Sequence, residues 1–81
     1  MNAVRVNDKD DNHDVVISAS SNVMVNGLPS VRVGDKDFPS NNTKIQGSPN
    51  VFVNGLAKHR VGDKDDNNNI SIVGSSNVIV N

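Results

Sequence analysis

The side chains best suited to bind a metal ion are the two histidines, His13 and His59, because the chain has no cysteine. Two imidazole nitrogens and one carboxylate form a donor set that suits Zn²⁺ or Fe²⁺ without sulfur. We therefore predict a metal ion, zinc or alternatively iron, bound by His13 and His59, with an aspartate or water completing the shell. Such an ion would cross-link the first and last parts of the chain. The alternative is that both histidines are ordinary surface residues.

Two aspartate-rich runs offer a second kind of metal chemistry. The first is Asp8-Lys9-Asp10-Asp11-Asn12, and the second is Asp63-Lys64-Asp65-Asp66-Asn67. Oxygen ligands at alternate positions are what Ca²⁺ prefers. However, a lysine lies inside each run, and both runs lack the glycine and the distal glutamate of an EF-hand loop. Solvated turns are therefore the favoured interpretation of these runs.

The residues needed for catalysis are scarce. A hydrolase needs a nucleophile, a base and an orienting group that meet in a pocket. This chain has two histidines, no cysteine and no glutamate, and its small size is expected to leave no room for a pocket of a few hundred cubic ångström. We therefore predict that the protein is not an enzyme.

The composition favours one small β-rich domain. With 81 residues, the chain can hold a single core at most. All nine acidic residues are Asp, and Asn occurs 14 times, and these residue types favour turns over helix. A chain of this size without disulfides usually needs a metal ion or a partner for stability. We predict one domain over residues 1–81 with no helix.

Charge and hydropathy exclude several classes of function. The formal net charge is −1, which provides no basic field for nucleic acid. No segment approaches the roughly 20 apolar residues needed to span a bilayer, and the first residues lack the apolar core of a signal peptide. We expect no transmembrane segment and no signal peptide.

An internal repeat is the main source of information in this sequence. Val4-Arg5-Val6, Val31-Arg32-Val33 and His59-Arg60-Val61 align, with the arginines 27 and then 28 residues apart. A second element follows each arginine after 17, 18 and 17 residues, beginning at Asn22, Asn50 and Asn77. We place the repeats at about residues 4–30, 31–58 and 59–81. In the second and third copies an aspartate, Asp35 or Asp63, is expected to hold a turn or to pair with the arginine of its own copy.

Within each copy the apolar residues alternate with polar ones, which is typical of strands. Asn26-Gly27 and Asn54-Gly55 are strong signals for tight hairpin turns. One such unit cannot bury its apolar face alone, but three can if their valine faces pack around a shared axis with pseudo-threefold symmetry. A linear β solenoid would also fit the repeat. We predict strands near residues 3–7, 14–18, 22–26, 30–34, 43–46, 50–54, 58–62, 69–73 and 77–80.

The repeated string resembles the PAAR-repeat proteins. The residues that carry the resemblance are Gly47 to Asp63, with matching tetrads that end at Arg5, Arg32 and Arg60. The resemblance implies an all-β fold, a small cone of short β hairpins. It also implies a metal ion near the apex, typically zinc bound by His and Cys. This chain departs from that pattern because it has no cysteine and only two histidines.

The resemblance also implies a mechanical function. Such proteins cap the trimeric β-helical spike of contractile injection machines, so we expect one copy of this chain per spike trimer and transient contact with a target outer membrane. A phage tail baseplate is the favoured machine because the chain is short, and a type VI secretion apparatus is the alternative. A function of a different class, a metal-binding or adhesive β-solenoid recognition module, predicts an elongated monomer and calcium-dependent folding.

Overall fold

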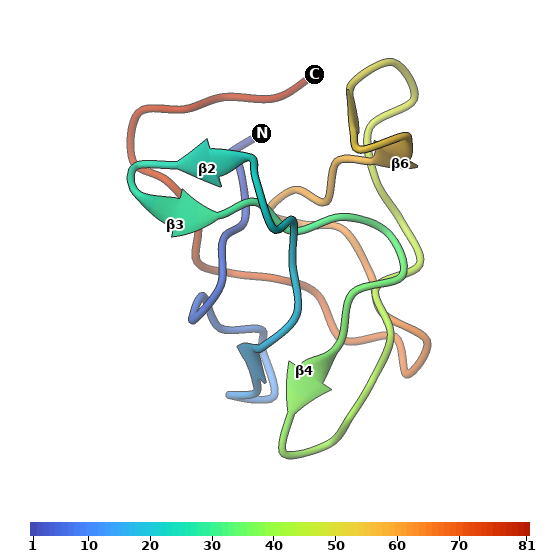
Figure 1. Ribbon diagram of the computed structural model, residues 1–81. Helices are drawn as coiled ribbons and strands as arrows, with labels where there is room; N and C mark the ends of the chain where they lie inside the picture. Colours follow the sequence, from blue (N-terminus) through green and yellow to red (C-terminus); the bar gives the residue numbers. More distant parts are fainter.

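The computed structural model describes residues 1–81 and contains no helix (Figure 1). Three antiparallel pairs of two-residue strands form the regular structure: β1 with β4, β2 with β3, and β5 with β6. Nine isolated bridges join the remaining segments. The predicted all-β fold of short antiparallel hairpins without helix is therefore confirmed. The structure accordingly has no helix that is long and apolar enough to span a membrane. The strands are β1 (Val15–Val16), β2 (Met24–Val25), β3 (Leu28–Pro29), β4 (Asp37–Phe38), β5 (Phe52–Val53) and β6 (Leu56–Ala57).

The strands are shorter than the predicted ones, and some are shifted. β1, β2 and β5 lie inside predicted ranges, whereas β3, β4 and β6 fall between them. Turn residues explain the short lengths. The chain adopts a left-handed backbone at Asn7, Gly34 and Gly62, which are the last residues of three segments that were predicted to be extended. Regular pairing therefore stops after two residues, and single bridges take its place.

The two Asn-Gly turns form as predicted. Asn26 and Gly27 have φ values of 52° and 80°, and Asn54 and Gly55 have φ values of 52° and 79°. Positive φ at both central residues is the requirement of a type I′ turn, whose twist suits a hairpin. Each turn joins two strands in the same register, with Val25 opposite Leu28 and Val53 opposite Leu56.

A third hairpin-like pair is assembled from the two ends of the chain. Ile79 forms a bridge with Asn2, as Met24 does with Pro29 in the first hairpin. The Val80 N–H donates to the Met1 carbonyl at 2.6 Å, and the Met1 ammonium donates back to the Val80 carbonyl at 3.1 Å. Both termini consequently lie at the same end of the molecule as β2 and β3 (Figure 1).

Three backbone hydrogen bonds form a closed ring at the centre of the fold. The Val4 N–H donates to His59 O at 3.4 Å, Val31 donates to Val4 at 3.2 Å, and His59 donates to Val31 at 3.1 Å. All three residues are fully buried. The ring means that the three aligned segments surround one line instead of following one another along a rod. The extents of 25 × 23 × 21 Å agree, so the elongated solenoid alternative is wrong.

The buried residues follow the sequence alignment closely. Of the 22 buried residues, all except Asp14 fall into sets of three that occupy aligned positions in the three segments. Only seven of the 22 are hydrophobic, so much of the interior is polar or charged. The sets are Ala3/Ser30/Lys58, Val4/Val31/His59, Asp8/Asp35/Asp63, Asp10/Asp37/Asp65, Val16/Lys44/Ser71, Ser20/Ser48/Ser75 and Val25/Val53/Val80.

Candidate functional site: an axial acidic cluster and an apolar end

The Arg-Asp unit of each of the three segments forms the same bidentate ion pair. The Arg32 guanidinium donates through Nε and Nη2 to both carboxylate oxygens of Asp35, at 3.1 and 3.0 Å. The Arg32 backbone N–H adds a third bond to Asp35 at 2.7 Å. Arg5 with Asp8 and Arg60 with Asp63 repeat this pattern. The predicted pairing of Asp35 and Asp63 with their own arginines is thus confirmed.

The aspartates two positions further on meet in the interior. Asp10, Asp37 and Asp65 are at most 1% exposed, and one carboxylate oxygen from each lies within 4.8 Å of the others. The second oxygen of each, Oδ1, accepts backbone N–H groups of the loop that follows, such as Asn42 to Asp37 at 2.8 Å. Every carboxylate therefore braces its own loop with one oxygen and directs the other toward its two counterparts. We call these three residues the axial acidic cluster.

A single lysine enters the axial acidic cluster. Lys44 Nζ donates to Asp37 Oδ2 at 3.1 Å and lies 3.9 Å from Asp10 Oδ2, and its side chain is only 1% exposed. Oδ2 of Asp10 and Oδ2 of Asp65 are buried and have no hydrogen-bond partner. Burial raises the pKa of Asp10, although backbone N–H groups and Lys44 act in the opposite direction. The cluster therefore contains three carboxyl groups and a single ammonium group.

The interpretation of the aspartate runs as solvated turns is wrong for four of their six acidic residues. Asp8, Asp10, Asp63 and Asp65 are buried, whereas Asp11 and the lysines inside the runs are exposed. Alternation is the reason, because side chains two positions apart in an extended segment point to the same side. The triple occurrence of Asp-Lys-Asp, which begins three residues after each arginine, was the signal that could have located the cluster.

His59 is placed in the central ring and is fully buried. Its Nδ1 lies 2.8 Å from the Gln46 carbonyl, which can only accept, so Nδ1 carries the proton. Nε2 then accepts from the Ser71 hydroxyl, also at 2.8 Å. Burial lowers the pKa of His59 to about 4, so the ring is neutral at physiological pH.

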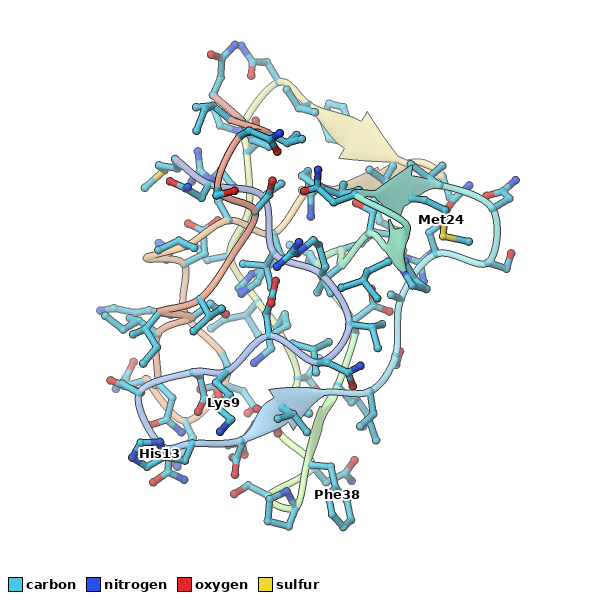
Figure 2. All side chains as sticks on the ribbon, turned by 90° about the vertical axis from the view of Figure 1, so that its left-hand side faces the viewer. Lys9, His13, Met24 and Phe38 are labelled. Atoms are coloured by element: carbon cyan, nitrogen blue, oxygen red, sulfur yellow. The ribbon has the colours of Figure 1, made fainter.

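His13 lies in an exposed loop, near Lys9 and at the end of the molecule where Phe38 also lies (Figure 2). Its backbone φ is 63°, similar to the 60° of Asn41 and the 64° of Asn68, so the three residues occupy equivalent positions. Asn41 is nine residues after its arginine, whereas His13 and Asn68 are eight residues after theirs. The second copy therefore has one additional residue, which lies before Asn41. The axial acidic cluster contains neither His13 nor His59. Metal binding through this pair stays a prediction, and a ring nitrogen of His59 would first have to release a hydrogen-bond partner.

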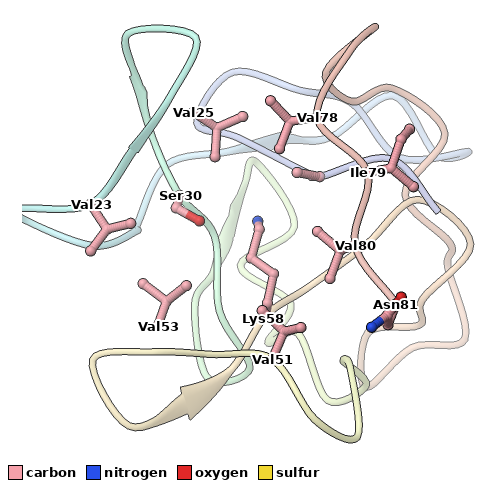
Figure 3. A pocket seen from close by; sticks show the side chains of 11 residues that line it. Val23, Val25, Ser30, Val51, Val53, Lys58, Val78, Ile79, Val80 and Asn81 are labelled. Carbon is pink, nitrogen blue, oxygen red and sulfur yellow. The ribbon is translucent and has the colours of Figure 1, made fainter.

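The opposite end of the molecule carries a pocket, and the expectation of no room for one is wrong. The pocket measures about 300 Å³, and eight of its 11 lining residues are hydrophobic (Figure 3). It arises because the interior is hollowed between the hairpins and the C-terminal segment. The lining residues are Ala3, Val23, Val25, Ser30, Val51, Val53, Lys58, Val78, Ile79, Val80 and Asn81.

Lys58 is the only charged residue that lines this pocket. Its ammonium donates to the carbonyls of Val4 and Val31, at 2.6 and 3.0 Å, and so caps the central ring of backbone bonds. Burial lowers the pKa of Lys58 to about 8, while Asp8 and Asp35 act to raise it. The pocket is therefore an apolar recess whose one lysine is bound to backbone carbonyls.

Large apolar side chains of the segments that line the pocket face solvent. Met24, Phe52 and Ile79 occupy aligned positions and are 53%, 60% and 64% exposed. Val23, Leu56 and Val78 are also exposed. Gathered apolar surface of this kind marks an interaction site in proteins. We call this end, with its pocket and its apolar rim, the apolar end.

These observations define a small all-β domain whose three aligned segments surround one axis. Comparison with protein families gives the particular family: the PAAR motif matches residues 6–67, most of the 81-residue chain. The chain therefore belongs to the PAAR motif family. Proteins of this family form the tip of the spike of contractile injection systems, and the family is known to bind a metal. No curated protein matches this chain.

The axial acidic cluster does not fit the family's metal well. Its donors are carboxylate oxygens only, a set that suits Mg²⁺, Ca²⁺ or Mn²⁺ better than zinc. In addition, Lys44 already places a cation within hydrogen-bonding distance of Asp37. The unpartnered oxygens of Asp10 and Asp65 face a cluster that contains its own ammonium group.

Proposed function

We propose that this protein is a structural tip that caps and sharpens the trimeric β-helical spike of a contractile injection machine, with one chain per spike trimer. The observation that carries the proposal is the closed ring of Val4, Val31 and His59 backbone bonds. This ring arranges three aligned segments of one chain around an axis, and so lets a monomer match a trimer at three positions.

The apolar end is the proposed docking face. Met24, Phe52 and Ile79 come from the three segments and supply an exposed apolar residue at each aligned position. A trimeric spike presents the same side chain three times around its own axis, so a partner with threefold-related apolar residues fits this face. Capping would bury these side chains and the pocket between them.

The opposite end is the proposed leading end, which contacts the target outer membrane. Its three loops are polar, and each is held by backbone N–H bonds to a buried carboxylate, as in Asn12 and Asp14 to Asp10 at 2.9 and 3.0 Å. Anchoring of this kind stiffens a loop without any helix or long strand. A stiff polar end suits a part that transmits force and does not need to bind.

Binding to a recombinant trimeric β-helical spike tests the docking face. Native mass spectrometry should give one chain per trimer, and Phe52→Asp should weaken binding by about 30-fold or more, as for an interface hot spot. Phe38→Asp is the matched control, because Phe38 and Phe52 are both 60% exposed but lie in different parts of the chain. Three chains per trimer, or equal losses for both variants, would contradict the proposal.

Of the two machines, we propose the phage tail baseplate, with type VI secretion as the alternative. Mass spectrometry of purified virions should detect the chain at one copy per tail. Its detection instead among proteins released by an active type VI apparatus would assign it to that machine.

The predicted metal, zinc or iron, is a proposal of its own. Elemental analysis of the purified chain should find one ion, and His13→Ala should remove it and lower the Tm. Because His13 is exposed and makes no side-chain hydrogen bond to a protein group, this variant leaves the hydrogen bonds of the interior unchanged. An unchanged metal content in His13→Ala would exclude His13 as a ligand.

A further inference from the structure

We infer that Lys44 is a built-in cation that takes the place of a bound metal ion in the axial acidic cluster. The ammonium lies within 3.1 Å of Asp37 and 3.9 Å of Asp10, and its side chain is 1% exposed. Lysine is almost never buried to this degree without partners. Its position is explained by the three carboxylates that meet there.

The need for a cation follows from the charges. Three carboxylates whose oxygens lie within 4.8 Å cannot all stay ionised in a buried place unless a positive group compensates them. No arginine serves this purpose, because each of the three is engaged by the aspartate three positions after it. Lys9, Lys36 and Lys64 are exposed. The ammonium of the buried Lys58 is bound to backbone carbonyls of the central ring instead. Lys44 is therefore the cation that the interior supplies.

The way in which Lys44 departs from the repeat supports the inference. Val16, Lys44 and Ser71 occupy one aligned position, since their N–H groups donate to the carbonyls of Asp8, Asp35 and Asp63 at 3.1, 2.8 and 3.2 Å. Only the second segment carries a charged residue there. A cluster on an axis has room for one cation, and one lysine from three equivalent positions provides it.

A tethered ammonium has different consequences from a bound ion. It cannot be removed by a chelator or by dilution, and it is compact enough to lie among carboxylates. The wild-type chain should therefore hold no ion in this cluster, and any ion that the wild-type chain binds elsewhere should also be bound by the Asp65→Asn variant. The inference concerns the interior alone and does not depend on spike binding.

Replacing the lysine should convert the cluster into a true cation site. We expect Lys44→Ala to lower the Tm by more than about 10 °C, because uncompensated carboxylates remain buried. Adding Ca²⁺, Mg²⁺ or Mn²⁺ in about a hundredfold excess over its Kd should then raise the Tm by at least about 5 °C, with one ion per chain by calorimetric titration. Lys36→Ala, which removes an exposed lysine, should show neither effect.

A second variant covers the case in which Lys44→Ala does not fold. Lys44→Met combined with Asp37→Asn removes one charge of each sign, and it should restore folding if charge imbalance caused the failure. The inference would be overturned if the wild-type protein held a metal ion that the Asp65→Asn variant did not hold. A Lys44→Ala chain that folds as stably as wild type would also overturn it, as would a double variant that stays unfolded.

Discussion

The two ends of this molecule are assembled from the same three segments, yet they bury opposite chemistry. Around the pocket, aligned Val25, Val53 and Val80 bury small apolar side chains beneath an exposed apolar rim. In the axial acidic cluster, aligned Asp10, Asp37 and Asp65 bury carboxylates and brace polar loops. One end is suited to a partner and the other to rigidity. A chain with seven buried hydrophobic residues therefore obtains much of its definition from charge and hydrogen bonds.

Removing a carboxylate should affect stability more than any other single change. Asp37→Ala takes the close partner from the buried Lys44 ammonium and an acceptor from the Asn42 N–H. Breaking a buried ion pair on one side typically costs 3–5 kcal/mol, so we expect a loss of about 4 kcal/mol. Urea unfolding monitored by circular dichroism measures it. Lys36→Ala, at an exposed neighbour, should stay within about 0.5 kcal/mol, and a small loss for Asp37→Ala would show that the acidic cluster is not important for stability.

Acidification should act on the central ring between the two ends. The pKa of His59 is about 4 when folded and about 6.5 when unfolded, so the unfolded chain binds more protons between these values. The free energy of unfolding should consequently decrease by about 3 kcal/mol as the pH falls from 6.5 to 4.

Urea midpoints across this pH range measure the effect. His59→Gln, whose amide can still donate to Gln46, lacks the titration and should lose less stability over the window. Identical pH profiles for wild type and His59→Gln would refute the prediction, because the carboxylates are common to both chains.

Truncating an apolar residue should cost less than removing a buried carboxylate. Val25→Ala deletes two buried methyl groups next to Ala3 and Val80, and we expect a loss of about 2 kcal/mol. Thermal and urea unfolding measure it, with the exposed Val23→Ala as the control. A loss larger than that of Asp37→Ala would reverse the comparison between the two ends.

The smallest effect is expected where the chain ends meet. Asn81 is aligned with Asn26 and Asn54, and Met1 is aligned with the residues that follow Gly27 and Gly55 in the two hairpins. One glycine added between Asn81 and Met1 should therefore join the chain ends in a type I′ turn. A circular permutant joined in this way and opened between Asn26 and Gly27 should retain the fold within about 1 kcal/mol. A permutant opened between Asp37 and Phe38 is the control and should be destabilised more. Equal behaviour of both permutants would show that the alignment of the termini with the hairpins is wrong.

Much of the local structure could be predicted from the sequence because it depends on neighbours. The Asn-Gly turns follow from the backbone preferences of two adjacent residues. The pairing of Arg32 with Asp35 joins residues three positions apart, and it recurs in each segment. Strand lengths were predicted less well, because single residues with positive φ, such as Asn7, interrupt pairing that alternation alone would continue.

The candidate sites were predicted poorly because they depend on residues far apart in the chain. His59 was recognised as a departure from the repeat, but its burial against Gln46 and Ser71 was not foreseen. The aspartates were interpreted as solvated, since nothing in one run reveals that two other runs face it. The lysine inside the cluster, Lys44, lies in a mostly polar segment between Thr43 and Ile45 and carried no signal by itself.

The sequence by itself determined the number of copies that align, the absence of helix, the hairpin turns and the arginine–aspartate pairs, since each rests on spacing or on adjacent residues. Only the tertiary structure decided that the three segments close into a ring, that three carboxylates meet around Lys44, and that Met1 completes a pair with Val80. The physical reason is that electrostatic and packing energies depend on distance in space. Residues 27 or more positions apart acquire these distances only when the chain has wrapped around its axis.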